Sequence, residues 1–406
     1  MISKMEVNRC DKKMPILLLV LTFVFSYFEF FFRLNTIMLI SYLGAFLLLL
    51  RSIGEFKRSR NIQLFLFGIF IVSVFQSINQ GDVNNYTPIT RTVILLVMYI
   101  IASYNSNSLL KSFLYMMIII AAICIVIYIL NYIPIVNNFL VNVIAPRCVS
   151  LGADKAYQEG GGINVIIFNF QYNYYFMSFN SIRNCGPFWE PGMYAVFLNL
   201  ALYVNLFIIK KGKVVTLLFL ISLISTLSTG GFAAGLFVLY SYLVLNRNKP
   251  IITILSFVIF VSALYFFSVT DFLGNKLNEQ LMHAQIGSDI SRFGAMLTQL
   301  KMIVDNPLLG YIGFKGYAIE TDYLASGTLL PLVQFGIPLG LVYYYMMYKA
   351  SRSFSIYYGK NIRTGNLLFF LILILSVSQT ILLTSFFYIY TFCGVIIKRD
   401  LRNGTV

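Results

Sequence analysis

The fold class of this chain is decided by residues 112–135, which read SFLYMMIIIAAICIVIYILNYIPI. The stretch contains no Asp, Glu, Lys or Arg. As a helix rising about 1.5 Å per residue, it is long enough to cross a hydrocarbon layer about 30 Å thick. Further apolar runs recur from Met14 to Ile397. A soluble domain cannot bury so much apolar surface, so the runs predict a polytopic membrane protein.

The composition of the 406-residue chain agrees, because 59% of its residues are hydrophobic and only 11% are charged. We predict an all-α fold with about twelve transmembrane helices, forming a single membrane domain over residues 1–406. No small-x-small cleavage site follows the basic N-terminus, so the first run is expected to stay as a helix. The predicted spans are 14–32, 35–50, 62–78, 91–104, 112–135, 191–209, 214–228, 230–246, 251–268, 329–348, 366–380 and 382–397.

Lys and Arg gather in short loops on one side of these spans, in the sequences RSIGEFKRSR, KKGK, NRNK, KASRSFSIYYGKNIR and KRDLR. Basic loops mark the cytoplasmic side, so both termini are predicted to be cytoplasmic. The net charge of +15 could also suggest nucleic-acid binding. Loop charge that orients a membrane protein accounts for it more simply, and no nucleic-acid partner is expected.

Two loops on the opposite side are long, residues 136–190 and 269–328, and loops of this size usually carry a function. The second loop predicts an amphipathic helix that starts at Ser288 or Asp289 and ends at 306–310, the sequence NPLLG. Such a helix would lie on the membrane surface or pack on the bundle. Its apolar residues recur at helical spacing: Ile290, Phe293, Leu297, Leu300 and Val304.

Motifs for nucleotide, metal or hydrolase chemistry are absent from the sequence. His283 is the only histidine, so we expect neither a metal site nor a cofactor. Cys148 and Cys185 fall in the same outer loop. A disulfide between them and two free thiols are both compatible with the sequence.

Four segments carry a resemblance to a known family. Residues 181–195, SIRNCGPFWEPGMYA, resemble the R-x-x-G-x-F-x-E-P-G-x-x-A pattern of bacterial O-antigen and capsule polymerases (Wzy-type). Residues 225–235, STLSTGGFAAG, are similar to the small-residue turn that follows in those polymerases and in the related O-antigen ligases. Residues 291–313, SRFGAMLTQLKMIVDNPLLGYIG, resemble their Arg-led outer helix. Residues 332–345, LVQFGIPLGLVYYY, resemble the membrane helix that comes next.

The resemblance implies a GT-C-like, metal-independent glycosyltransferase in the bacterial inner membrane, with its active site facing the periplasm. Its substrates would be oligosaccharides on undecaprenyl diphosphate in membrane lipid. A polymerase passes the growing glycan to the sugar of another lipid-linked repeat unit, whereas a ligase passes it to lipid A–core. A chain-length regulator and a flippase would be its protein partners.

Two departures from the family pattern matter. The ligases carry a histidine just before the helix that begins here near Leu329, but residues 320–330, ETDYLASGTLL, contain none. This favours polymerase over ligase. The ligase-like turn often has an arginine after its serine, whereas here Thr229 follows Ser228. Any phosphate contact at this turn would therefore use hydroxyl and backbone N–H groups.

Arginine is the natural partner for a diphosphate in a site without a metal, because it stays charged and binds phosphate oxygens with two parallel donors. Arg183 and Arg292 lie in the family motifs, and we predict that they are catalytic. Arg292 would also start a helix, where backbone N–H groups favour anions. Arg91 and Arg147 are further candidates for substrate binding. The alternative for each arginine is an interaction with lipid headgroups.

Glu190 is the best candidate for a base that accepts the proton of the acceptor hydroxyl, because it stands at the membrane edge. The alternative is structural, since a carboxylate before Pro191 can satisfy free N–H groups at a helix start. The remaining substrate-binding candidates are Ser228, Thr229, Asp289 and Asp322, with Glu320 as a further acid. A lipid flippase or transporter is the rival of another class, but it would place polar or charged residues near the middle of several spans, and the middle segments here are almost uncharged.

Overall fold

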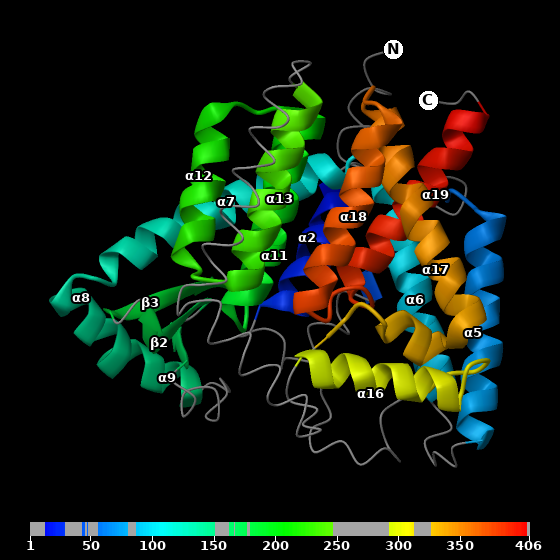
Figure 1. Cartoon of the computed structure of the whole chain (residues 1–406), viewed down its shortest axis with the longest axis horizontal. Helices are drawn as coiled ribbons and strands as arrows, with labels where there is room; N and C mark the ends of the chain where they lie inside the picture. The colour runs from blue at the N-terminus through cyan, green and yellow to red at the C-terminus, as the bar shows by residue number, and fades with distance from the viewer. Residues whose placement is uncertain are drawn as a thin grey trace. The chain divides into compact units, whose positions relative to one another are not determined.

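The computed structural model is mostly helical (Figure 1). It describes residues 13–28, 43–44, 47, 56–79, 87–150, 162–165, 167–176, 179–246, 292–311 and 326–403. Within these residues, five helices are long and apolar enough to cross a membrane: Arg60–Asn79, Pro88–Asn105, Leu109–Leu130, Pro191–Ile209 and Leu330–Tyr357. The prediction of helices with transmembrane character is confirmed. The twelve crossings and the GT-C-like arrangement stay predictions.

Contacts divide the chain into two compact units. The first unit comprises residues 1–23, 36–109 and 280–406, and the second comprises residues 24–35 and 110–279. Helix α2 (Lys13–Tyr27) contributes to both. The predicted spans 35–50, for the most part, and 251–268 lie outside the described residues, while each other predicted span coincides with a helix.

The first unit is built around α19 (Ser385–Arg402), which contacts α17 (Leu330–Tyr357) and α6 (Thr87–Asn105). Helix α18 (Ile362–Ser378) also packs on α17, and α5 (Arg60–Asn79) packs on α6. Large aromatic side chains fill the core between these helices. Phe65 stacks on Tyr343 at 5.9 Å between ring centres, and Phe392 lies edge-on to both Phe65 and Tyr99.

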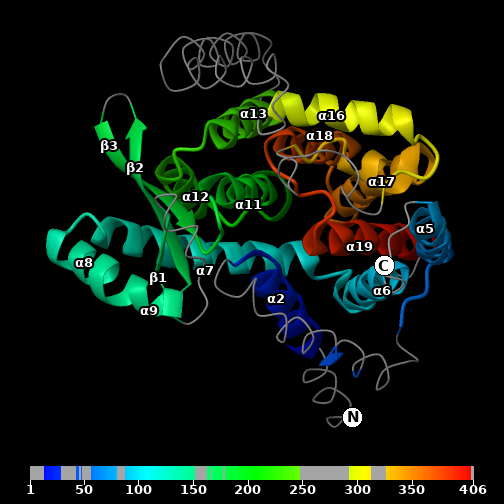
Figure 2. The same cartoon turned by 90° about the horizontal axis from the view of Figure 1, so that it is seen from below.

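Helix α16 (Arg292–Asp305) crosses the ends of the first unit's helices and contacts α17 (Figures 1 and 2). It is the helix predicted in the second outer loop, and it packs on the bundle. Its buried face includes Ala295, Met302 and Ile303, which lie against Val333. The described residues of the predicted apolar stripe point away from this core: Leu297 is 59% exposed, and Leu300 and Val304 are also exposed.

The second unit contains α7 (Leu109–Leu130) and a group of three helices. These are α11 (Pro191–Tyr203) with its π-helical extension η3 (Val204–Ile209), α12 (Lys213–Ser225) and α13 (Thr229–Asn246). Helix α7 ends five residues before the predicted end of its span, and Pro134 then starts α8 (Pro134–Phe139). Proline fits this position because the first helical residue needs no N–H partner.

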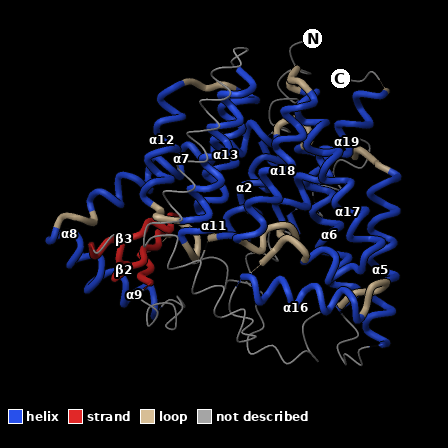
Figure 3. Tube along the Cα trace, in the orientation of Figure 1, coloured by secondary structure: helices blue, strands red, loops and turns tan. Residues whose placement is uncertain are grey.

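The first outer loop corrects the all-α prediction. After α8, η2 (Leu140–Ile144) and α9 (Ala145–Ser150), it forms a three-stranded antiparallel sheet (Figure 3). The strands β1 (Gly162–Val165), β2 (Phe168–Phe176) and β3 (Phe179–Gly186) pair in sequence order. The sequence FNFQYNYYF of β2 is rich in aromatic residues, which favour strands.

Candidate functional site

In the second unit, Arg183 joins β3 to the turn before α13. Its Nε and Nη2 atoms donate hydrogen bonds to the carbonyl oxygens of Thr226 and Leu227, each at 3.2 Å. Its Nη1 atom donates to Oε1 of Gln171 at 3.0 Å. Leu227 has a φ of 46°, which is rare for a residue other than glycine, and the bond from Arg183 stabilises it. The motifs at 181–195 and 225–235 are thus in direct contact.

Two more residues of the first motif support the same contact. The side-chain amide of Asn184 donates to Oγ of Ser225 at 3.0 Å, and its Oδ1 accepts the N–H of Gly186 at 2.9 Å. Gly186 has a φ of 56°, and a Cβ there would lie 3.1 Å from the ring of Tyr194. A glycine at this position therefore allows the strand to turn tightly over the start of α11.

Helices α11 and α13 approach each other closely at the second motif. A Cβ on Gly231 would lie 2.5 Å from the Cβ of Ala195. Asn199 bridges the helices, since its side-chain nitrogen donates to the carbonyls of Ala195 and Gly231, both at 2.9 Å. The small residues of this motif are thus explained by helix packing.

Ser228 and Thr229 lie at the start of α13 and are largely buried. Oγ of Ser228 accepts the N–H of Gly231 at 3.3 Å, which is the geometry of a helix cap. In the structure the Ser228 hydroxyl therefore caps the N-terminus of α13. The contact of Ser228 and Thr229 with substrate stays a prediction.

Glu190 is the N-cap residue of α11 by position, with a φ of −149° and a ψ of 156°. Its side chain caps no N–H group of the helix, although Pro191 follows it. The carboxylate is partly buried and makes no hydrogen bond or ion pair with any residue that the structure describes. Next to it, Phe188 stacks on Tyr194 at 5.6 Å and on Phe197 at 5.1 Å. The capping interpretation of this carboxylate has no support in the geometry.

Arg147 is exposed on α9, and its predicted role stays a prediction. The neighbouring Cys148 is buried, as is Cys185, and no disulfide joins the two. Of the two alternatives that the sequence left open for these cysteines, the structure therefore does not have the disulfide.

In the first unit, Arg91 lies in the first turns of α6 and is held by neutral oxygens. Nη1 donates to Oγ of Ser73 and to Oε1 of Gln76, both at 3.3 Å. Nη2 donates to Oε1 of Gln334 at 3.1 Å, and the guanidinium carbon lies 4.6 Å from the ring centre of Phe335. Among the described residues, no carboxylate forms an ion pair with this guanidinium. Its charge can therefore attract an anion.

Gln76 extends the network around Arg91. Its Nε2 atom donates to the carbonyl oxygen of Gln334 at 2.9 Å and also to that of Leu309. Gln76 is fully buried in the structure. The sequence analysis named Arg91 but missed Gln76 and Gln334, which are amides inside otherwise apolar runs. A polar side chain in such a run is the signal that could have identified them.

The third and fourth motifs meet at a break in α17. The N–H of Tyr311, just after α16, donates to the carbonyl of Val333 at 2.8 Å. The N–H of Ile337 donates to the carbonyl of Pro307 at 2.7 Å. These bonds satisfy backbone groups that the break leaves without a partner in the helix. Two segments far apart in the sequence are therefore joined backbone to backbone.

Glycine is required on both sides of this contact. Gly336 has a φ of 70°, and a Cβ there would lie 2.2 Å from the carbonyl oxygen of Leu308. Gly310 has a φ of 67°, and a Cβ there would lie 2.4 Å from the carbonyl oxygen of Val333. Neither position has room for a side chain, and both have a conformation that favours glycine.

Arg292 is the first residue of α16, near the N-terminus of the helix as predicted, while the predicted start at Ser288 or Asp289 lies outside the described residues. Asp289, Glu320, Asp322 and His283 lie outside the described residues. Arg183, Glu190, Ser228 and Thr229 belong to the second unit, whereas Arg91 and Arg292 belong to the first. Within the described ranges, no three His, Cys, Asp or Glu side chains gather in a way that could hold a metal ion.

Comparison with known proteins finds no family model that matches this chain and no curated protein that matches it.

Proposed function

We propose that the chain is a surface-polysaccharide polymerase of the O-antigen type. It transfers a growing glycan from undecaprenyl diphosphate to the sugar of another lipid-linked repeat unit, at the periplasmic face of the bacterial inner membrane. In this proposal the chain has twelve crossings and a GT-C-like arrangement, with both termini in the cytoplasm. A chain-length regulator and a flippase act with it.

The observation that carries the proposal is the carboxylate of Glu190. It is partly buried and has no hydrogen-bond or ion-pair partner among the described residues, although its position is that of a helix cap. Other motif residues have a role in the fold, such as the contacts of Arg183 and of Gly336. A carboxylate without a structural partner is available to a substrate hydroxyl.

The contacts between motifs also support the proposal. Within each unit, two motifs of the resemblance touch: 181–195 with 225–235, and 291–313 with 332–345. Residues that share a contact are expected to occur together in a family pattern. This observation supports a common fold, and the chemistry rests on Glu190.

The proposed reaction breaks the bond between the anomeric carbon of the glycan and the diphosphate. The acceptor hydroxyl attacks this carbon, Glu190 takes its proton, and undecaprenyl diphosphate leaves. Charge on the leaving diphosphate is stabilised by arginine, because a guanidinium binds two phosphate oxygens at once. Arg292 and Arg91 stay the candidates that the sequence indicates for this contact. Arg183 acts mainly by positioning, since it binds the turn before α13.

Two alternatives remain in the proposal. An O-antigen ligase has the same donor but a different acceptor, and the missing histidine in 320–330 speaks against it. A flippase is favoured by one observation, the break of α17 at Gly336 beside Arg91, because broken helices with polar partners occur at transport sites.

Deletion of the gene in a producing strain separates these functions on a gel of surface polysaccharide. A polymerase deletion leaves a single repeat unit on the surface. Loss of all surface polymer with lipid-linked polymer retained indicates a ligase. Failure to expose lipid-linked units at the outer face indicates a flippase. Either of the last two results would contradict the proposal.

A further inference from the structure

A basic pocket lies in the first unit where α5 begins and α19 ends, at the end opposite to α16 (Figure 1). Its volume is about 300 Å³, and its walls come from α5, α17 and α19. The residues that line it include five cations and no carboxylate. The cations are Arg60, Lys349, Lys398, Arg399 and Arg402.

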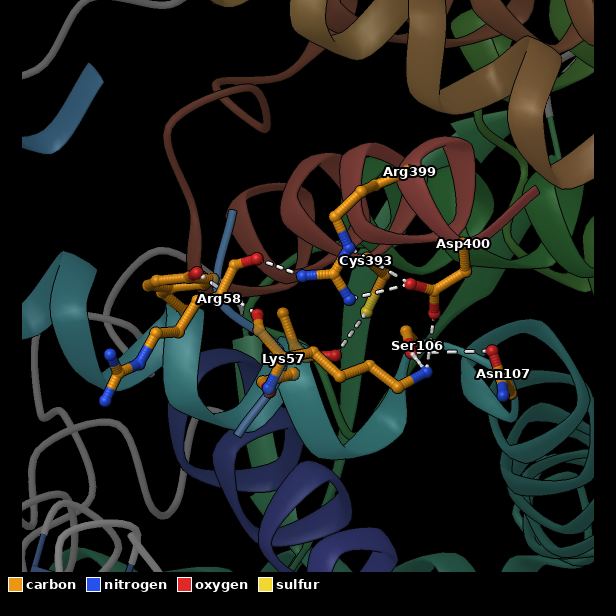
Figure 4. Close-up of polar contacts among 10 residues, drawn as sticks. Lys57, Arg58, Ser106, Asn107, Cys393, Arg399 and Asp400 are labelled. Carbon is orange, nitrogen blue, oxygen red and sulfur yellow. Dashed lines mark hydrogen bonds and ion pairs between the residues drawn. The ribbon is translucent and has the colours of Figure 1, made fainter. Parts of the chain in front are cut away.

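The carboxylate closest in sequence to these cations is Asp400, which is already engaged. Its Oδ2 atom pairs with Nζ of Lys57 at 2.8 Å, and its Oδ1 atom pairs with Nη2 of Arg399 at 2.7 Å. Figure 4 shows Lys57 and Arg399 reaching Asp400 from two sides, while Arg399 also binds the carbonyl of Arg58. With 6% of its side chain exposed, Asp400 has no further capacity to neutralise the pocket.

The other four cations of the pocket form no ion pair with any described residue. Their mutual repulsion is visible at Lys398, which lies beyond the predicted span. Burial lowers the pKa of Lys398, and the positive charges of Lys349 and Arg402 lower it further. A concave surface with several unpaired cations attracts a polyanion, and phosphate is the natural partner of clustered Lys and Arg.

Apolar stripes lead from the surface of the bundle to this pocket. On α17, Ile337, Leu341 and Tyr345 are exposed at four-residue intervals, and Lys349 follows at the pocket. On α5, exposed Phe67 and Leu64 lead down to Arg60 in the same way. The two helices are neighbours, as α5 and α17 are in contact. Tyr345 also lies beneath Lys349, whose Nζ is 5.1 Å from the ring centre. An aromatic ring and a lysine together are typical of the membrane interface.

We propose that this pocket binds the phosphate headgroup of an anionic phospholipid, with the acyl chains lying along the exposed faces of α5 and α17. The pocket supplies positive charge at the end of the two exposed apolar faces of α5 and α17. An anionic phospholipid requires this arrangement, because its phosphate needs cations and its two acyl chains need apolar surface. By the distribution of Lys and Arg, this end of the unit faces the cytoplasm. The lipid site is separate from the proposed glycan chemistry, which lies at the outer face.

Native mass spectrometry of the purified full chain tests this proposal, with phosphatidylglycerol and phosphatidylcholine added in turn. We expect bound phosphatidylglycerol and little phosphatidylcholine. The double variant Lys349→Gln/Arg402→Gln should bind phosphatidylglycerol about thirtyfold more weakly, since each cation near an anionic lipid contributes a factor of about five. It should remain folded, because neither side chain forms an ion pair with a described residue and the change relieves repulsion between like charges.

The matched control is Lys360→Gln/Arg363→Gln, which removes the same charge at the same end of the unit but outside the pocket. It should bind phosphatidylglycerol as the native chain does. Equal binding of both lipids, or equal binding by the two double variants, would overturn the proposal. Displacement of the lipid by inorganic phosphate at millimolar concentration would assign the pocket to a soluble phosphate and overturn the lipid source.

Discussion

The two contacts between sequence motifs are made in different ways. In the first unit, the turn after α16 meets the break of α17 backbone to backbone, and Gly310 and Gly336 leave no room for a side chain. In the second unit, the guanidinium of Arg183 reaches the carbonyls of Thr226 and Leu227. A backbone contact tolerates no added atom, whereas a side-chain contact can be weakened in steps. In both cases the residues that make the contact have a structural role, whereas the Glu190 carboxylate has no hydrogen-bond or ion-pair partner among the described residues.

The largest effect on stability is expected from Gly336→Ala. The new Cβ would lie 2.2 Å from the carbonyl oxygen of Leu308 at a φ of 70°. Strain and overpacking together should lower the free energy of unfolding by about 2–6 kcal/mol. Thermal unfolding of the purified protein in detergent measures this effect.

Gly359→Ala is the matched control for that variant. Gly359 has a similar φ of 66°, but a Cβ there meets no atom within 4 Å. It should cost only about 1–2 kcal/mol, which is the backbone strain alone. Equal losses in the two variants would show that the contact between the motifs does not constrain Gly336.

A smaller loss, of about 1.5–3 kcal/mol, is expected from Arg183→Gln. The variant leaves the carbonyls of Thr226 and Leu227 without their charged donor. Arg183→Lys should recover only part of this stability. A lysine keeps the charge, but its single ammonium cannot reproduce the several fixed donors of the guanidinium. Polymer yield should follow the amount of folded protein in both variants. A loss of polymer at normal thermal stability would place Arg183 in the chemistry instead.

The ion pair of Asp400, at the other end of the first unit, differs from both motif contacts because its contribution to stability depends on pH. At low pH its loss should have the smallest effect of the three. Burial by itself raises the pKa of Asp400, but hydrogen bonds from Lys57 and Arg399 outweigh it and lower the pKa below its usual value of 3.8. A carboxyl with a lowered pKa stabilises the fold above its unfolded pKa, and this stabilisation is lost as the pH falls through the folded pKa.

Asp400→Asn should therefore cost about 1.5–3 kcal/mol at pH 7 and progressively less below about pH 4. Urea unfolding at several pH values measures the difference from the native chain. The cost of Gly336→Ala should not change over the same range, because no titrating group takes part in that contact. A pH-independent cost of Asp400→Asn would contradict the assigned ion pair.

The helices could be predicted from the sequence because their signal is local. The run at 112–135 has no charge to interrupt it, and the NPLLG turn ends α16 as predicted. The contact of that turn with Gly336 could not be predicted, since no local pattern shows which carbonyl a distant glycine will meet. Which face of α16 packs on the bundle could not be predicted for a related reason. Ala295, Met302 and Ile303 lie toward the bundle, whereas Leu297 is exposed.

The sheet was not predicted because aromatic residues, which favour strands, are also common at membrane interfaces. At the candidate site, the sequence indicated Arg183 and Glu190 but could not separate their roles. The structure separates them. Arg183 binds the turn at 226–227 through hydrogen bonds, whereas the Glu190 carboxylate has no hydrogen-bond or ion-pair partner among the described residues. Both depend on where the turn at 226–227 and the start of α11 lie in space.

Polymer length and yield for Glu190→Gln, normalised to folded protein in the membrane, test the central claim most directly. The amide keeps the shape of the side chain but loses its basicity, so polymerisation should fall by about 10²–10⁴-fold at unchanged thermal stability. Asp305→Asn makes the same chemical change at an exposed acid of the second outer loop and should leave polymer unchanged. Near-normal polymer from Glu190→Gln would contradict the account and remove Glu190 from the chemistry.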